Sequence, residues 1–270
     1  MRQAVNGIDI AYDVQGREGA PWVVLVHGFP FSRATWAGQT AVLARDFRVL
    51  TYDLRGLGET ALGPAPQPLE AYVDDLLGLL DALGIARAGL AGLSMGGYIA
   101  LRAVERAAER FWALALCDTR SEPDSDEGKL GRAAGIRSLH RDGAAAFLAG
   151  LLPKLLLRPD SAAGRALEEV MRRNGAAGMA NALAAMQGRT DTTPALAAFD
   201  LPVLVLVGSG DVLTPPDVAR TLARRIRGAR LEVLADAGHV SNLEAPEAFN
   251  AALSDFLRSA AETQPGSRTP

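Results

Sequence analysis

Short apolar runs alternate with longer amphipathic stretches along most of the chain. The runs are rich in Val, Leu and Ala, a pattern typical of buried strands, and the stretches repeat apolar residues every three or four positions, as helices do. Strands separated by helices predict an α/β protein with a mostly parallel sheet. We expect strands at 8–14, 22–26, 48–52, 88–93, 111–117, 203–207 and 230–234, and helices at 36–44, 69–83, 95–107 and 246–259.

The alternation stops after Asp118 and resumes near residue 203. Residues 119–193 are helical in pattern, so we expect a helical cap inserted into an α/β core formed by 1–118 and 194–260. The polar end of the chain, 261–270, contains Pro and Gly and is predicted to be a disordered tail. Apolar cap residues could pack the cap helices together or cover a cleft: Phe147, Leu151, Leu152, Leu155, Met171, Met179, Leu183 and Met186.

Composition narrows the class of protein. Hydrophobic residues make up 49% and charged residues 22%, as in ordinary globular enzymes, and a net charge of −3 offers no basic face for nucleic acid. Cys117 is the only cysteine, so no intramolecular disulfide is expected, and a reducing cytoplasm fits. No stretch has the length of a signal peptide core or a membrane span, so we expect a cytoplasmic protein without a membrane partner.

Ser94 lies in a Gly-Leu-Ser-Met-Gly sequence between a predicted strand and a predicted helix. A serine on so tight a turn crowds the residues two before and two after it, and Gly92 and Gly96 meet that demand. The turn also points the first helical N–H groups, that of Met95 among them, at charge developing beside the serine. We interpret Ser94 as a nucleophile. The five-residue match also arises by chance, so other segments have to support it.

A serine nucleophile needs a general base, which is usually histidine. Of the three histidines, His239 follows the last predicted strand and precedes the last helix, where we expect the base. His27 begins a His-Gly-Phe-Pro loop that it is expected to brace, and His140 is expected to face solvent. The same loop can aim the N–H of Phe29 toward that of Met95, giving two donors for an oxyanion.

The acid that orients the base should also follow a strand. Asp211 does so, in a Gly-Ser-Gly-Asp sequence, and is the favoured partner of His239. Asp118 ends the preceding strand and stays an alternative. Asp236 and Glu244 are near the histidine in sequence, but we expect them to take solvated loop and helix-cap roles.

These segments, with an Asp-Leu-Arg-Gly-Leu-Gly turn at 53–58, together resemble the α/β-hydrolase superfamily over roughly residues 5–257. The resemblance implies a mostly parallel central sheet flanked by helices, with a helical cap after the sixth strand. The Cys-Asp-Thr-Arg run at 117–120 is similar to bacterial carboxylesterases and aryl esterases near the 3-oxoadipate enol-lactonases and cofactor-free haloperoxidases. Arg120 could contribute to the anion-binding set of the enol-lactonases. Haloalkane dehalogenases and epoxide hydrolases carry aspartate where this chain has Ser94.

Residues and resemblance together predict a carboxylic ester hydrolase of the EC 3.1.1 type that cleaves small esters through an acyl-enzyme. Ser94 would attack, His239 would move the proton, Asp211 would steady the imidazolium, and the Phe29 and Met95 amides would hold the oxyanion. No metal or organic cofactor is expected. Alternatives are lactone or enol-lactone hydrolysis, haloperoxidase-like perhydrolysis, and a ligand-binding protein on a hydrolase fold. The sequence favours short acyl chains but leaves open the physiological substrate, the stereopreference and a homo-oligomer.

Overall fold

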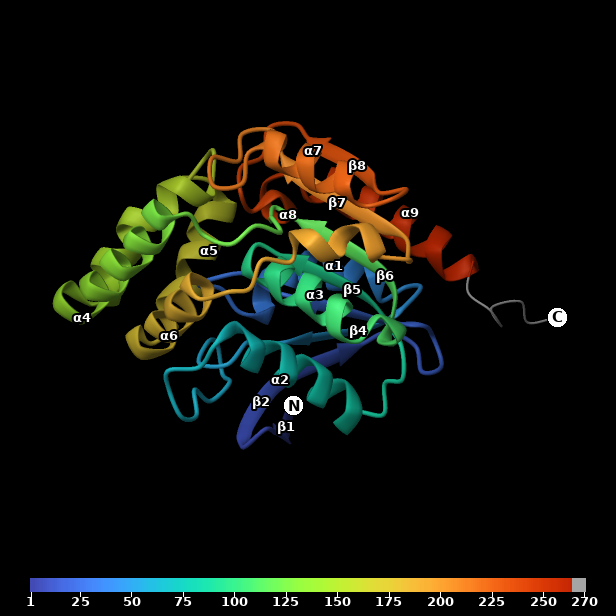
Figure 1. The fold of residues 1–270 in the computed structure, drawn as a ribbon, viewed down its shortest axis with the longest axis horizontal. Coiled ribbons are helices and arrows are strands. Elements are labelled where there is room, and N and C mark those ends of the chain that lie inside the picture. The colour runs from blue at the N-terminus through green and yellow to red at the C-terminus, as the bar shows by residue number, and fades with distance from the viewer. Residues whose placement is uncertain (264–270) are drawn as a thin grey trace.

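The computed structural model describes residues 1–263, and their centre is an eight-stranded sheet (Figure 1). The strands are β1 (Arg2–Val5), β2 (Ile8–Gln15), β3 (Trp22–Val26), β4 (Arg48–Tyr52), β5 (Ala88–Leu93), β6 (Phe111–Cys117), β7 (Val203–Gly208) and β8 (Arg230–Leu234). Their spatial order is β1-β2-β4-β3-β5-β6-β7-β8. Strand β2 runs antiparallel to both of its neighbours, and all the other pairings are parallel. Strands β5, β6 and β7 are buried along their whole length, as expected of parallel strands covered on both faces. The predicted fold class is confirmed.

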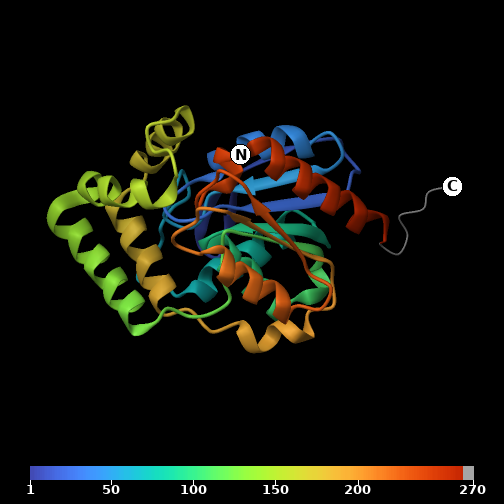
Figure 2. The same ribbon diagram turned by 90° about the horizontal axis from the view of Figure 1, so that it is seen from above.

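Helices cover both faces of the sheet (Figure 2). Helices α1 (Ala37–Leu43) and α9 (Pro246–Glu262) pack together on one face, and α2 (Leu69–Ala82), α3 (Met95–Arg106) and α7 (Pro216–Arg225) lie on the other. The short elements are η1 (Arg33–Trp36), η2 (Ala108–Arg110), η3 (Thr193–Ala198) and α8 (Ser241–Glu244). Helix α2 shows why helices cover the sheet, because its apolar stripe is fully buried against it. This stripe includes Val73, Leu76 and Leu80.

Three further helices follow the sixth strand, as the resemblance implies. They are α4 (Asp126–Leu155), α5 (Ala162–Arg172) and α6 (Ala176–Gln187). They form a layer beside the core, at the left in Figures 1 and 2, and α4 bends at Gly143. Helix α6 touches the core so closely that a Cβ atom at Gly178 would lie 1.7 Å from the carbonyl oxygen of Gly56. The cap therefore rests on the loop after β4 through backbone contact.

The end of the chain differs from the prediction. The predicted tail starts at residue 261, whereas α9 continues to Glu262. The helix is longer because Ala260 is buried and Ala261 still packs against the core. The rest of the predicted tail, 264–270, lies outside the described residues.

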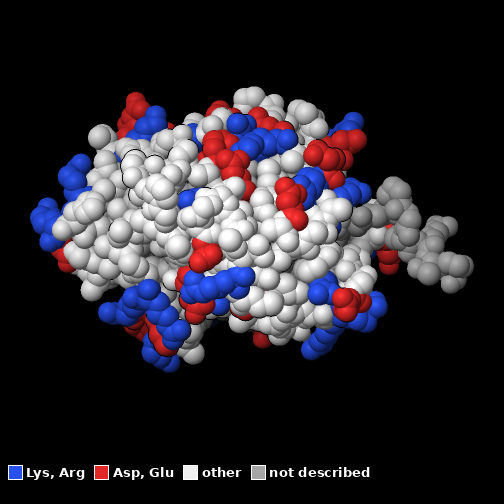
Figure 3. All heavy atoms as spheres, turned by 90° about the horizontal axis from the view of Figure 1, so that it is seen from below, with Lys and Arg blue, Asp and Glu red and all other residues white. Residues whose placement is uncertain are grey.

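Surface charges of opposite sign stand next to one another on the face shown in Figure 3. Ion pairs such as Arg106 with Glu70 and Asp74, and Arg172 with Glu168, show the same local compensation. This face therefore carries no continuous patch of one sign. Across residues 1–263, no helix is both long enough and apolar enough to cross a membrane.

Candidate active site

Ser94 occupies a strained turn between β5 and α3. Its backbone angles are φ 52° and ψ −113°, a region that residues other than glycine seldom adopt. A Cβ atom at Gly92 would lie 2.3 Å from the carbonyl oxygen of Gly96, and one at Gly96 would lie 2.2 Å from that of Val26. Both positions therefore require glycine, which is the spacing that the sequence motif predicts.

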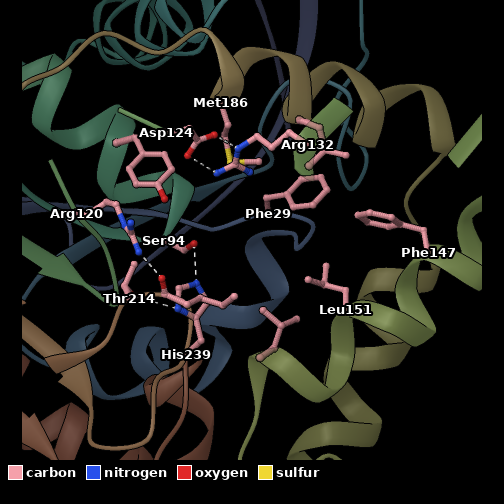
Figure 4. Close-up of a pocket in the computed structure, with 14 residues that line it drawn as sticks. Phe29, Ser94, Arg120, Asp124, Arg132, Phe147, Leu151, Met186, Thr214 and His239 are labelled. Atoms are coloured by element: carbon pink, nitrogen blue, oxygen red, sulfur yellow. Dashed lines mark hydrogen bonds and ion pairs between the residues drawn. The ribbon is translucent and has the colours of Figure 1, made fainter. Parts of the chain in front are cut away.

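Three side chains from three strand ends form one hydrogen-bonded chain. His239 Nε2 lies 2.8 Å from Ser94 Oγ (Figure 4), and His239 Nδ1 lies 2.8 Å from Asp211 Oδ2. Ser94 follows β5, Asp211 follows β7 and His239 follows β8, so the parallel sheet brings its carboxyl ends, and these residues, together. All three are buried. The order is that of a nucleophile, a base and an orienting acid.

Asp211 is held by more than the imidazole. Its Oδ1 accepts hydrogen bonds from the N–H groups of Leu213 (2.8 Å) and Thr214 (2.9 Å), and its Oδ2 accepts one from Thr214 Oγ1 (2.5 Å). Burial raises the pKa of this carboxyl, but the hydrogen bond and charge of His239 and the bonds from Thr214 outweigh burial and lower it. The carboxylate is therefore ionised and keeps the imidazole proton on Nδ1. Thr214 is absent from the predicted site. The available signal was Asp211 itself, because an aspartate in a loop often accepts hydrogen bonds from backbone N–H groups a few residues further on.

Asp118, the alternative acid, faces elsewhere. Its Oδ1 accepts a hydrogen bond from Gly208 N–H (2.9 Å) and its Oδ2 accepts one from Ser241 Oγ (2.5 Å). Burial, followed by repulsion from Asp211, raises the pKa of Asp118 to about 7. It thus ties the end of β7 to α8 behind the site, and the structure brings Asp211 to His239 instead.

The two predicted oxyanion donors flank Ser94. Met95 begins α3, so its N–H has no acceptor within the helix. The loop that carries Phe29 lies against the serine, because a Cβ atom at Gly28 would be 3.1 Å from Ser94 Cβ. Within residues 1–263 neither amide donates a hydrogen bond to another protein group. Both remain available to a negatively charged oxygen in the pocket.

The other two histidines take the places predicted for them. His27 Nε2 accepts a hydrogen bond from Leu54 N–H (2.9 Å), so its Nδ1 carries the proton and donates to the carbonyl oxygen of Gly28 (2.8 Å). Burial lowers the pKa of His27 and keeps the ring neutral. His27 therefore braces the loop, and His140 lies exposed on the cap.

A cavity of about 270 Å³ opens above the serine and the histidine (Figure 4). Its lining residues are Phe29, Ser94, Tyr98, Arg120, Asp124, Arg132, Phe147, Leu151, Leu155, Leu183, Met186, Leu213, Thr214 and His239. Phe147 stands edge-on to Phe29 with ring centres 6.1 Å apart, which joins cap to core. Leu152, Met171 and Met179 do not line the cavity and pack in or against the hydrophobic core, to which Leu155, Leu183 and Met186 of the lining also belong. Some apolar cap residues thus take both of the roles that the sequence left open.

One side of the cavity is charged. Arg132 donates two hydrogen bonds to Asp124, and the same carboxylate accepts one from Arg189. Burial raises the pKa of Asp124, but the two arginines outweigh it and lower that pKa. The guanidinium of Arg189 in turn lies 4.2 Å from the ring centre of Tyr98. Arg132 and Arg189 therefore share one carboxylate partner, and the cluster, which the sequence alone did not reveal, keeps one net positive charge.

Arg120 differs from Arg132. It donates a hydrogen bond to the carbonyl oxygen of Leu213, and among residues 1–263 no carboxylate lies within ion-pair distance of its guanidinium. Arg120 therefore brings an uncompensated positive charge to the cavity wall.

Neither Cys117 nor the residue types that bind metals form a second reactive or metal-binding site in the described part of the chain. Burial, together with the charge of Asp118, raises the pKa of the Cys117 thiol well above its usual range. Within the part of the chain that the structure describes, no three His, Cys, Asp or Glu side chains cluster so that they could hold a metal ion.

Comparisons with known proteins point in one direction. A sequence model described as the alpha/beta hydrolase family matches residues 23–252. The chain is 30% identical over 259 residues to 3-oxoadipate enol-lactonase 1 of Acinetobacter baylyi, covering 94% of this chain and 95% of that protein. It is similar to the structure of a thermophilic esterase from Thermogutta terrifontis (TM-score 0.91, 34% identity, 96% of this chain and 99% of that one). It is also similar to the structure of the enol-lactonase from Burkholderia xenovorans LB400 (TM-score 0.89, 34% identity, covering 96% of this chain and 100% of that one).

Proposed function

The chain belongs to the alpha/beta hydrolase family, and on that premise we propose that it is a serine hydrolase that cleaves small carboxylic esters through an acyl-enzyme. The observation that carries the proposal is the continuous hydrogen-bonded chain from Asp211 through His239 to Ser94, with both joining distances 2.8 Å. The relatives named as an esterase and as enol-lactonases act on the same kind of bond.

The geometry supports a two-step acyl transfer. Ser94 Oγ attacks the ester carbonyl while its proton passes to His239 Nε2, and Asp211 stabilises the imidazolium. The oxyanion of the tetrahedral intermediate accepts hydrogen bonds from the Phe29 and Met95 N–H groups. The imidazolium then protonates the leaving alkoxide, and a water molecule activated by His239 releases the acid from the serine.

Cavity size supports short acyl chains. At about 270 Å³ the cavity lies near the lower end of small-molecule sites, and Phe147, Leu151 and Leu155 of the cap line it. We expect rates to fall from p-nitrophenyl acetate to the octanoate ester.

The test of the proposal is Ser94→Ala, measured against the p-nitrophenyl ester series and a fluorophosphonate probe. We expect a loss of kcat on the order of 10⁶ and no labelling, with an unchanged melting curve. Ser259→Ala, at an exposed serine on α9, is the matched control and should keep full activity. Activity of Ser94→Ala within about tenfold of the wild type would contradict the assignment, and a ligand-binding protein on this fold would label poorly in its wild-type form.

The uncompensated charge of Arg120 favours a second candidate, hydrolysis of esters or lactones that carry a carboxylate, as enol lactones of dicarboxylic acids do. The mono-p-nitrophenyl ester of succinic acid and p-nitrophenyl acetate separate the two. If Arg120 binds the carboxylate, Arg120→Gln should lower kcat/KM for the anionic ester by about 10- to 100-fold and leave the neutral ester within about twofold. The exposed cap residue Arg137, changed to Gln, is the control. Equal losses on both esters would count against this candidate.

A further inference from the structure

The cap contacts the core not only at its two covalent connections but also through hydrogen bonds elsewhere. Residues 118–125 lead into the cap and 188–192 lead out. One such attachment lies at the end of α4, where the carbonyl oxygen of Leu155 accepts a hydrogen bond from the backbone N–H of His239 (2.9 Å). The last carbonyls of a helix have no partner within it, so this bond docks the end of α4 onto the loop that carries the proposed base.

The carboxylate of Glu244 spans the same junction. Its Oε2 accepts hydrogen bonds from Gly238 N–H (2.7 Å) and Leu157 N–H (3.1 Å), and its Oε1 accepts one from Arg158 N–H (3.0 Å). Gly238 directly precedes His239, whereas Leu157 and Arg158 belong to the cap. One half-buried side chain thus joins both sides, and only a carboxylate can accept through both of its oxygens while donating through neither.

The surrounding backbone leaves little room at this junction. A Cβ atom at Gly238 would lie 3.0 Å from Glu244 Oε2 and 3.1 Å from the Leu157 nitrogen. A Cβ atom at Gly210, next to Asp211, would lie 2.5 Å from Leu157 Cδ2. The cap segment 155–158 therefore packs against the loops of both the proposed acid and the proposed base.

We propose that Glu244 is a positioning residue that fixes the cap to the catalytic loop. The four backbone bonds at the junction, three to Glu244 and one from His239 to Leu155, are the cap latch. Since Leu155 also lines the cavity, the latch sets the imidazole and the apolar wall of the cavity relative to each other. This inference rests on the proposed function, because it assigns the latch an effect on His239 as the base.

Glu244→Gln tests the latch with the smallest change of shape. An amide has one acceptor oxygen and one donor nitrogen, so it faces at least one of the three N–H groups with another donor. We expect kcat on p-nitrophenyl acetate to fall at least tenfold, because small displacements of a catalytic group cost up to about 10²-fold. We also expect the difference in KM between the acetate and hexanoate esters to narrow, because the wall at Leu155 is released.

Two measurements distinguish positioning from a general loss of stability. The first is kcat per active site titrated with the fluorophosphonate probe, which removes any unfolded fraction from the value. The second is amide hydrogen exchange without substrate, in which segments 155–158 and 236–240 should both exchange faster. Glu247→Gln, at an exposed residue in the first turn of α9, removes the same charge without touching the latch and should match the wild type. Glu244→Asp keeps both acceptor oxygens on a shorter side chain, so its kcat and exchange rates should lie between those of the wild type and those of Glu244→Gln. If Glu244→Gln does not fold, Glu244→Asp should still have a lower kcat and faster exchange at the two segments than the wild type.

Three results would overturn the inference. The first is that Glu244→Gln and Glu247→Gln give equal values in both measurements, and the second is that Glu244→Gln exchanges faster over the whole chain while its kcat per titrated site is unchanged. The third is that Glu244→Gln does not fold and Glu244→Asp behaves like the wild type. A wild-type protein that neither labels nor cleaves esters overturns the proposed function instead. The exchange at the two segments then decides the latch alone.

Discussion

Exchanging Asp211 for asparagine should disable His239 while leaving the loop in place. Oδ1 of Asp211 accepts the backbone N–H groups of Leu213 and Thr214, and this pair of donors keeps the oxygen of an asparagine in that position. The amide nitrogen then takes the place of Oδ2, 2.8 Å from Nδ1 of the imidazole, and donates to it. The ring proton moves to Nε2, which can no longer accept the proton of Ser94.

The expected loss is about 10⁴ in kcat, or about 5.5 kcal/mol of transition-state stabilisation. KM should change little, because Asp211 does not line the cavity. Asp118→Asn provides the comparison, since its new amide can accept from Gly208 N–H and donate to the Ser241 hydroxyl, so both native bonds have a replacement. With the pKa of Asp118 at about 7, roughly half of this residue is already neutral at pH 7. We expect its exchange to cost less than about tenfold there.

Steady-state kinetics on p-nitrophenyl acetate, normalised to fluorophosphonate-titrated sites, measure both variants. The reverse ranking would refute the reasoning and move the acid to Asp118. Comparable losses from both exchanges would point to one shared network, and the double variant would then lose far less than the sum of the two.

The remaining predictions concern stability and packing. Burial raises the pKa of Asp118 from 3.8 to about 7 in the folded state, so the folded protein holds this proton more tightly than the unfolded chain does. The protonated side chain therefore contributes its full stability below about pH 4, and this contribution is lost as the pH rises to 7. The free energy of unfolding of Asp118→Asn, measured with urea, should therefore rise by on the order of 4 kcal/mol relative to that of the wild type between about pH 4 and pH 8. A difference between the two proteins that does not change with pH would contradict this. Gly96→Val would place a side chain 2.2 Å from a carbonyl oxygen of β3, so a soluble and active variant would refute the turn geometry. Gly178→Ala should destabilise by about 1–3 kcal/mol in thermal melts because its Cβ would meet the Gly56 carbonyl, whereas Gly175→Ala, with open space around it, should not.

Central strands could be predicted from the sequence because burial on both faces gives uninterrupted apolar runs. The predicted bounds 22–26, 48–52, 88–93 and 111–117 are those of central strands in the structure, and 230–234 are those of the edge strand β8. Among the strands and the longer helices of the core, β1 and α7 were not predicted. In β1 only Val5 is buried, and α7 buries Ala219, Leu222 and Ala223 among charged residues, so neither has a continuous apolar signal.

The candidate triad could be located because this fold places such residues where strands end, and short motifs mark those positions. Ser94, Asp211 and His239 lie together as the sequence indicated. Glu244 could not be found in the same way. We expected a solvated loop or helix-cap role near His239, yet its carboxylate bonds to Leu157 and Arg158, which are 87 and 86 residues away. Contacts of such separation depend on how the cap rests on the core, which no local pattern contains.

The charge of the cavity depends on the same placement. In the sequence, Arg120 and Arg132 both lie near the start of the cap, and only the family resemblance singles out Arg120. The sequence does not show which of the two has a carboxylate partner. In the folded chain Asp124 pairs with Arg132 and Arg189, so Arg132 has a carboxylate partner, whereas the guanidinium of Arg120 bonds only to a backbone carbonyl among the described residues. The second candidate function therefore depends on which arginines the aspartate reaches, and the number of basic residues in the cap does not predict it. Substrate charge is set by such contacts and not by the shared fold, which is why Arg120→Gln and the two esters are needed to test it.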